Sequence, residues 1–331
     1  MSGKPITVKV EKGEKANTRR VVFEVELTSD QEAIDKADLG KRRQTCKICG
    51  AEGDFQTWVG VELFIGLKES FNYFVCPECE TLQIQEFPSD IGRHYAHDYY
   101  SFSPPEIRPA PPGTKKDSRM ILDVGCGNGA WLCSLAAAGC VNLFGCDPFI
   151  EKNLTYANGV KIKKSTIHEM DGQYDVIHLG DSFEHMPDPH EVFQSFDRLL
   201  KHGKGVYGEA PKVEIIIPVY PNIAFDVYGP FWYQMDPPRH FFLYSEKSLK
   251  MLADQYGFDI ASIDYASAGG AFAMSRMYQM GITFMVGQQK LASDLALKDL
   301  RDQTNLFSIL AKYSDEAGHS DHATITLVRR K

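Results

Sequence analysis

Short apolar runs alternate with amphipathic helical patterns over residues 117–270. The apolar runs have the length of buried strands, and the helical stretches repeat apolar residues three or four positions apart. The predicted strands are Met120–Val124, Val141–Cys146, Val160–Ile162 and Tyr174–Leu179, and the predicted helices are Ala130–Gly139, His190–Leu200 and Ser245–Tyr256. This alternation favours a doubly wound α/β fold around a mostly parallel, Rossmann-like sheet.

Composition divides the chain before this region into three segments. Residues 1–45 predict an arm or hairpin, because they contain a strand-like run at Arg20–Leu27 and a polar, helical stretch at Ser29–Lys41. Residues 46–103 join a unit bounded by cysteines to a Tyr-rich segment. Residues 104–116 are rich in proline, which neither a helix nor a central strand accommodates, and they predict a linker.

The end of the chain predicts an extension of the α/β domain. Residues 271–331 contain a helical pattern over Lys290–Lys312 and a strand-like run over Ala323–Val328. We expect this extension to pack on the α/β domain.

Composition and charge exclude several classes of protein. With 43% hydrophobic and 24% charged residues, the chain of 331 residues has the composition of a globular protein rather than a disordered one. It contains no apolar run of the roughly 20 residues that span a membrane, and no apolar stretch follows the N-terminus, so we expect a cytoplasmic protein. Thirty-six basic and 44 acidic residues give a net charge of −8, which disfavours binding to nucleic acid.

Two C-x-x-C pairs predict a metal site. Cys46 and Cys49 are separated from Cys76 and Cys79 by 26 residues, and glycine or proline in each pair's neighbourhood favours tight turns. Two such turns supply the four thiolates of a tetrahedral zinc site of zinc-ribbon type. A closed shell of four sulfurs is structural rather than catalytic. Reduced cysteines without a metal, or an iron site, are the alternatives.

A glycine-rich turn with nearby carboxylates predicts a nucleotide-type cofactor site. The turn contains Gly125, Gly127 and Gly129, and it follows the predicted strand that ends with Asp123 and Val124. The glycines alone also fit a dinucleotide. However, Asp123 would repel a diphosphate and attract the ammonium of a methionine group. Asp147 ends the next predicted strand, where a carboxylate can accept from ribose hydroxyls.

The sequence from Asp123 to Gly129 resembles the first motif, D/E-x-G-x-G-x-G, of the class I S-adenosylmethionine-dependent methyltransferases. The resemblance covers about residues 118–265. It implies that S-adenosylmethionine is the cofactor and that the site residues already named bind it. It further implies that Thr166 and Ile167 face the adenine and that Asp181 belongs to the same site.

Two later stretches resemble methyltransferases of bacterial sugar and glycan biosynthesis. They are Phe183-Glu184-His185-Met186-Pro187-Asp188-Pro189 and the segment Trp232 to Phe258, which contains Pro237-Pro238-Arg239-His240. Some of these enzymes also have an N-terminal four-cysteine zinc module followed by a Tyr-rich segment, as at Tyr95, Tyr99 and Tyr100 here. The resemblance implies a sugar or glycan precursor as acceptor. O-methylation is favoured over C-methylation because residues 270–331 are too few for the C-terminal domain of the sugar C-methyltransferases.

A hydroxyl acceptor requires a group that removes its proton. The candidates are His185, His240 and Glu184, since histidine titrates near neutral pH and both histidines follow predicted sheet strands. Two alternatives stay open. One is an RNA-modifying methyltransferase whose zinc module contacts RNA, and the other is a non-catalytic module that binds zinc and cofactor.

Overall fold

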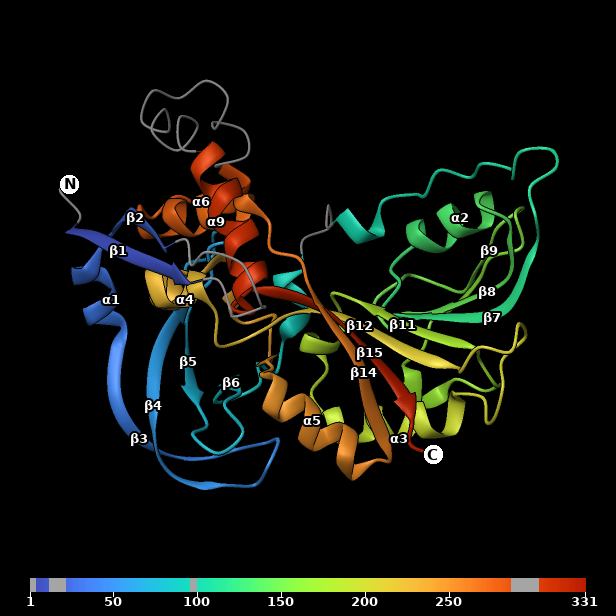
Figure 1. Ribbon diagram of the computed structural model, residues 1–331, viewed down its shortest axis with the longest axis horizontal. Coiled ribbons are helices and arrows are strands. Elements are labelled where there is room, and N and C mark those ends of the chain that lie inside the picture. Colours follow the sequence, from blue (N-terminus) through green and yellow to red (C-terminus); the bar gives the residue numbers. More distant parts are fainter. Residues whose placement is uncertain (1–3, 12–21, 96–99, 287–303) are drawn as a thin grey trace. The chain divides into compact units, whose positions relative to one another are not determined.

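The computed structural model describes residues 4–11, 22–95, 100–286 and 304–331 (Figure 1). The chain forms two compact units, and each is assembled from segments that are far apart in the sequence. The first unit comprises Met1–His94, Pro218–Ser248 and Asp264–Ala323, and the second comprises Tyr95–Ile217, Leu249–Ile263 and Thr324–Lys331. This interleaved division differs from the expected succession of domains along the chain.

The second unit is built around an eight-stranded sheet with the strand order β14-β15-β12-β11-β7-β8-β10-β9. The strands are β7 (Asp117–Val124), β8 (Cys140–Cys146), β9 (Leu154–Thr155), β10 (Lys161–Lys163), β11 (Val176–Gly180), β12 (Lys212–Pro218), β14 (Phe258–Tyr265) and β15 (His322–Arg329). The five strands from β12 to β10 pair in parallel, and β9 is antiparallel. The predicted α/β fold with a mostly parallel sheet is therefore confirmed.

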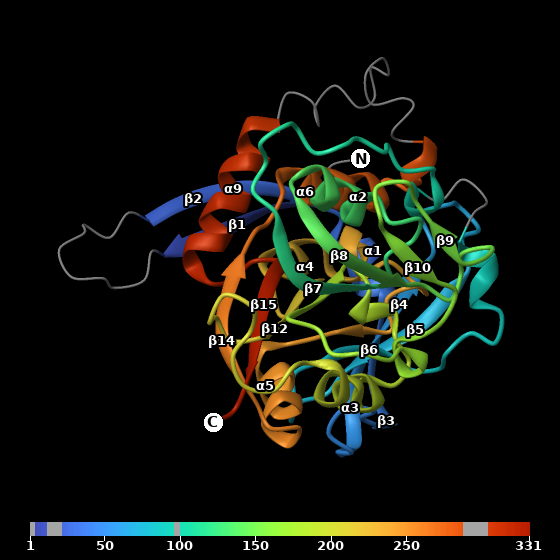
Figure 2. The same ribbon diagram turned by 90° about the vertical axis from the view of Figure 1, so that its right-hand side faces the viewer.

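Helices cover both faces of this sheet. In both views α2 (Ala130–Ala137) lies on one face and α3 (Pro189–Leu199) on the other (Figure 1, Figure 2). The side chain of Asp188 accepts a hydrogen bond from the amide of Glu191, at 3.0 Å, and so caps the start of α3, where Pro189 occupies the first turn. Leu132 of α2 packs with Leu143 of β8 in the buried core. The remaining regular helices of this part of the chain are α5 (Glu246–Gln255), η2 (Tyr100–Phe102), η3 (Ile167–Glu169) and η4 (Phe183–His185).

The first unit contains an antiparallel sheet of five strands in the order β13-β6-β5-β4-β3. The strands are β3 (Asp38–Thr45), β4 (Glu52–Val61), β5 (Ser70–Val75), β6 (Leu82–Ile84) and β13 (Phe242–Leu243). The helices are α1 (Gln31–Ala37), α4 (Ile223–Tyr228), α6 (Gly269–Gln279), α9 (Thr304–Ala317), η1 (Ile91–His94), η5 (Gly229–Phe231) and η6 (Tyr233–Met235). The expected N-terminal hairpin is present as the antiparallel pair β1 (Lys4–Glu11) and β2 (Val22–Ser29).

Several elements differ from the sequence expectations. The expected helix at Ser29–Lys41 ends at Ala37, and the polar residues that follow form the edge strand β3, which pairs through its backbone. Strand β14 and helix α6 were not predicted. In the expected helix Lys290–Lys312, residues 290–303 lie outside the described residues, and α9 continues to Ala317. None of the helices in the described residues has the length and apolarity to cross a bilayer.

The C-terminal segment is divided between the two units. Most of residues 271–331 belong to the first unit, and Thr324–Lys331 alone belong to the α/β unit. The reason is long-range packing: Phe307 of α9 stacks on Phe272 of α6, whereas β15 enters the large sheet between β14 and β12.

A buried carboxylate connects three segments of the second unit. Asp175 is 3% exposed, and its carboxylate accepts hydrogen bonds from the Met120 amide at 2.7 Å, the Val206 amide at 3.3 Å and the Lys201 ammonium at 2.6 Å. Burial acts to raise the pKa of Asp175, but the hydrogen bonds from Lys201 and Met120 outweigh it and hold the pKa below its usual range. The charged form of Asp175 therefore stabilises the fold.

Asp175→Asn is expected to lower the free energy of unfolding by about 1.5–3 kcal/mol at pH 7, the range for hydrogen bonds to charged groups. Because the pKa of the folded state is lowered, this stabilisation is present above the pKa of the unfolded state and is lost as the pH falls through the folded-state pKa. Urea unfolding at pH 7 and at pH 3 measures both effects. Asp171→Asn, at an exposed position, is the control. Equal stability of wild type and Asp175→Asn at pH 7 would contradict the assignment.

Candidate functional site

Two carboxylates stand at the carboxyl ends of adjacent parallel strands in the second unit. Asp123 is the penultimate residue of β7, and Asp147 directly follows β8. They are 4% and 6% exposed, and both line a cavity of about 820 Å³. The carboxyl edge of a parallel sheet is where open α/β folds bind their ligands.

The glycine-rich turn after β7 forms part of this wall. Gly125, Gly127 and Gly129 have φ angles of +74°, +53° and +80°, which favour glycine. A Cβ on Gly125 would lie 2.5 Å from the Cβ of Ser182, so the turn also needs the missing side chain for space. Gly125 lines the cavity, whereas Gly127 and Gly129 are not among its lining residues.

The last two glycines instead allow close packing behind the wall. A Cβ on Gly127 would lie 2.3 Å from the carbonyl oxygen of Ser101, and one on Gly129 would lie 2.4 Å from Cδ1 of Ile162. The amide of Gly127 also donates to Oδ2 of Asp147 at 2.9 Å. Gly127 therefore serves the predicted site by orienting a carboxylate.

The two carboxylates are electrostatically unfavourable neighbours. Burial raises the pKa of Asp123 well above its usual range, and the charge of Asp147 adds to the effect. Burial also raises the pKa of Asp147, although the amides of Phe149 and Gly127 act in the opposite direction. Among the described residues that line the cavity there is no lysine or arginine. The cavity therefore favours a ligand that is positively charged near Asp123.

The other predicted cofactor residues lie around the same cavity. Thr166 and Ile167 follow β10, and the Glu169 side chain fixes the start of η3 by accepting from the Thr166 amide at 3.0 Å. Asp181 follows β11 with a φ of +48°, and its amide donates to the carbonyl of Ile216 at 2.9 Å. Together with the segments that follow β7 and β8, loops after four different strands thus converge on one cavity.

His185 lines this cavity from η4. Its Nδ1 lies 3.3 Å from the hydroxyl of Tyr95, which is also a lining residue. Glu184 is fully buried and does not line the cavity, and its Oε1 lies 4.0 Å from Nε2 of His185. His185 can therefore meet a ligand, while Glu184 is placed behind it. Tyr99 lies outside the described residues, as does the side chain of Tyr100.

His240 belongs to the first unit and is not among the residues that line the cavity. It follows η6, and its Nδ1 lies 2.7 Å from the carbonyl oxygen of Gln234. Its Nε2 lies 3.6 Å from Oδ2 of Asp236, which also pairs with Arg239 at 2.6 Å. The hydroxyl of Tyr73 donates to the carbonyl of His240 at 2.8 Å. This turn is held by hydrogen bonds and ion pairs within the first unit.

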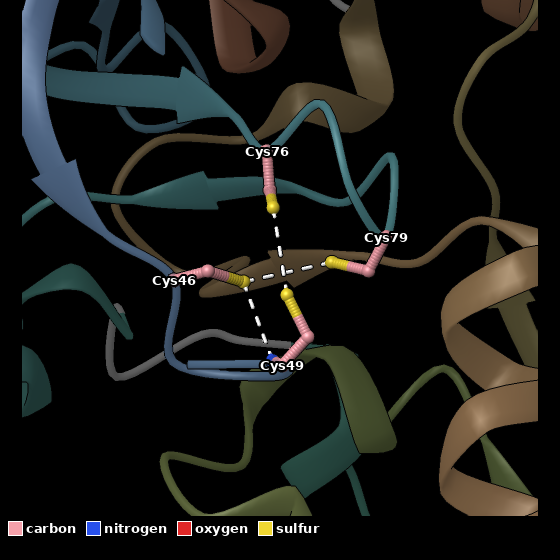
Figure 3. A group of neighbouring side chains, drawn as sticks. All are labelled: Cys46, Cys49, Cys76 and Cys79. Atoms are coloured by element: carbon pink, nitrogen blue, oxygen red, sulfur yellow. Dashed lines mark hydrogen bonds between the residues drawn. The ribbon is translucent and has the colours of Figure 1, made fainter. Parts of the chain in front are cut away.

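The four predicted metal ligands converge in the first unit (Figure 3). Cys46 and Cys49 lie in the turn between β3 and β4, and Cys76 and Cys79 lie in the turn between β5 and β6. The sulfur atoms lie within 4.8 Å of one another. Gln83 donates to Sγ of Cys46 at 3.1 Å. Four sulfurs at this spacing suit a tetrahedral ion such as zinc.

The cavity also contains residues that the sequence analysis missed. Trp131 of α2 stacks on His178 of β11, with ring centroids 3.8 Å apart and planes 14° apart, and both rings line the cavity. Tyr95 stacks on Phe149 at 5.3 Å. The signal for His178 was present, because an imidazole interrupts the apolar run Val176–Leu179 of a central strand.

Comparison with known protein families gives one match. A family model described as "Methyltransferase domain" matches residues 94–263, which is 170 of the 331 residues of the chain. Most of the matched residues lie in the second unit and include the turn and carboxylates described above.

Relatives with curated descriptions match a shorter region. A ubiquinone biosynthesis O-methyltransferase of Bordetella avium (strain 197N) is 35% identical over 101 residues, covering 27% of this chain and 41% of the relative. The protein of the same description from Escherichia coli O7:K1 (strain IAI39 / ExPEC) is 31% identical over 99 residues, covering 27% and 41%. The chain thus spans about two fifths of the length of the relatives it matches.

Two solved structures that match this chain share little sequence with it. A cyclopropane synthase from Mycobacterium tuberculosis has a TM-score of 0.39 at 14% identity, covering 65% of this chain and 79% of that one. A putative sarcosine dimethylglycine methyltransferase from Galdieria sulphuraria has a TM-score of 0.38 at 16% identity, covering 66% and 81%.

Proposed function

The chain belongs to the methyltransferase family whose model spans residues 94–263, and we propose that it transfers the methyl group of S-adenosylmethionine to a hydroxyl oxygen of a small acceptor. The proposal rests on two buried carboxylates, Asp123 and Asp147, that line the same cavity. The described residues that line this cavity include no lysine or arginine to neutralise them. A sulfonium nucleoside with an ammonium group would relieve their unfavourable burial. A dinucleotide would add a diphosphate to an already acidic wall.

The residues around the cavity fit the parts of this cofactor. Asp123 would accept a hydrogen bond from the ammonium group. Asp147 already accepts hydrogen bonds from the amides of Gly127 and Phe149, and its remaining lone pairs would accept hydrogen bonds from the ribose hydroxyls. Ser165, Thr166 and Ile167 would border the adenine. The cofactor supplies an activated methyl group, so the protein's task is to position the acceptor and to handle its proton.

We assign the proton transfer to His185. Its ring lines the cavity, and the hydroxyl of Tyr95 contacts Nδ1. A neutral imidazole would take the hydroxyl proton as the oxygen attacks the methyl carbon. Glu184 would orient the ring from behind. His240, which lies outside the residues lining the cavity, remains a second candidate for the same role.

The charge of the cavity limits the part of the acceptor that enters it. Five acidic side chains contribute to its lining, namely Asp123, Asp147, Asp181, Asp188 and Glu191. A phosphate or carboxylate on the acceptor would find no lysine or arginine among the described lining residues. We therefore propose that the reacting part of the acceptor is uncharged, which fits a sugar or glycan hydroxyl and disfavours entry of the diphosphate of a nucleotide-linked sugar.

The relatives suggest a second acceptor class. These relatives are described as ubiquinone biosynthesis O-methyltransferases, and a hydroxyl on a ubiquinone-type precursor is also uncharged at the reacting atom. The aromatic side chains of Phe102, Trp131 and Phe149 on the cavity favour this class. The turnover experiment below therefore tests both sugar and ubiquinone-type acceptors.

Asp147→Asn is expected to weaken binding of S-adenosylhomocysteine about 10- to 100-fold, because hydrogen bonds to a charged group contribute about 1.5–3 kcal/mol. Isothermal titration calorimetry measures the change, and the exposed Asp171→Asn serves as the control. NAD is titrated in parallel. Binding of NAD in place of S-adenosylhomocysteine by the wild type would refute the proposed function.

His185→Gln is expected to reduce turnover about 100-fold or more, the usual contribution of a general base, while the affinity for S-adenosylhomocysteine changes less than threefold. Turnover is followed as S-adenosylhomocysteine release with uncharged glycosides, catechols and a sugar phosphate as acceptors. We expect an uncharged class to react and the sugar phosphate to fail. Undiminished turnover of His185→Gln would exclude His185, and His240→Gln then tests the second candidate.

The four cysteines support a further part of the proposal, a structural zinc ion in the first unit. The purified protein is expected to contain one zinc per chain, and Cys49→Ser to lose it and to melt at a lower temperature. Metal analysis and thermal unfolding measure both, with Cys140→Ser as the control because Cys140 lies outside the cluster. Absence of stoichiometric zinc from the wild type, purified without chelator, would count against the metal site.

A further inference from the structure

His178 is a buried imidazole in the wall of the cavity. It is the third residue of β11, is 6% exposed and packs flat against Trp131. Its Nδ1 is buried and has no hydrogen-bond partner among the residues that the structure describes. Burial lowers the pKa of His178, although Glu214 and Asp181 act in the opposite direction, so the ring is neutral near pH 7. None of the roles proposed above is assigned to His178.

The Nε2 atom of His178 points toward the carboxyl edge of the sheet, where the cavity lies. A Cβ built on Gly180 would lie 3.0 Å from Nε2 of His178, so Nε2 lies on the side of the strand end. Gly180 and Asp181 line the cavity there. Because no described residue accepts a hydrogen bond from Nδ1, the tautomer with hydrogen on Nε2 avoids a buried N–H without a partner. The imidazole therefore presents an N–H donor toward the cavity.

An acidic side chain stands beside this donor. His178 of β11 is in register with Asp123 of the parallel strand β7, so both side chains point to the same face of the sheet. An N–H donor next to a carboxylate is complementary to the carboxylate and ammonium of an amino acid. The other cavity histidines each have one ring nitrogen close to a hydroxyl: His168 lies 3.0 Å from Ser195, and His185 lies 3.3 Å from Tyr95.

We infer that His178 binds the carboxylate of the cofactor's methionine group through Nε2–H, next to the ammonium held by Asp123. This inference rests on the proposed function, since it concerns S-adenosylmethionine. It explains how the zwitterionic end of the cofactor is bound by a cavity whose described lining contains neither lysine nor arginine. Trp131 fixes the plane of the imidazole, and Gly180 leaves the space that its Nε2 requires.

The test compares two ligands that differ by one carboxylate. S-Adenosylhomocysteine and its decarboxylated analogue, which retains the ammonium, are titrated into wild type, His178→Phe and His178→Gln by calorimetry. His178→Phe keeps an aromatic ring against Trp131 and is expected to weaken S-adenosylhomocysteine binding about 10- to 100-fold, with less than a twofold effect on the analogue. His178→Gln retains an N–H donor and is expected to recover at least half of the lost binding free energy. His190→Phe, away from the cavity lining, controls for the substitution itself.

The outcomes separate this inference from the proposed function. If wild type binds S-adenosylhomocysteine and His178→Phe binds it equally well, the role of His178 is overturned and the proposed function stands. Equal weakening of both ligands would show that His178 acts by packing on Trp131, which also overturns the inference. If wild type binds neither ligand, the proposed function itself fails.

Discussion

The burial of two carboxylates, Asp123 and Asp147, on one cavity is the constraint on which the site in the second unit depends. Parallel pairing of β7 and β8 brings their carboxyl ends together, and the fold then buries both acids on one cavity. Neither charge is neutralised by a lysine or arginine among the described lining residues. A ligand that carries positive charge to this edge therefore gains binding free energy by removing a penalty that the folded protein already has.

The glycine-rich turn makes this arrangement possible by letting backbone approach where side chains would clash. Gly125 passes against Ser182, and Gly127 uses its amide to hold Asp147 in place. The same cavity wall then combines charged and aromatic groups, since the Trp131–His178 stack adjoins the carboxylate of Asp123 through strand register. The residues that line the cavity thus come from neighbouring strands of one sheet rather than from a single motif.

The first unit illustrates how distant segments share one structural core. The four-cysteine turns end strands of its sheet, and β13, from more than 150 residues later in the chain, adds to the edge of that sheet beside β6. Ser245 donates to the carbonyl of Cys79, and Tyr73 donates to the carbonyl of His240. A metal ion at the cysteines would therefore stabilise the turn that contains His240 as well as its own ligands.

The sequence alone determined the features that depend on local patterns: the strands β7, β8, β10 and β11, the helices α2, α3 and α5, the glycine turn and the spacing of the cysteines. Hydrophobic periodicity and turn residues encode these within a few positions. The tertiary structure decided what depends on long-range packing. It placed residues 264–323 with the cysteine sheet, put His185 on the cavity lining, and joined His178 to Trp131 and Asp123. Such neighbours are set by strand order and register, which the composition of a single segment does not specify.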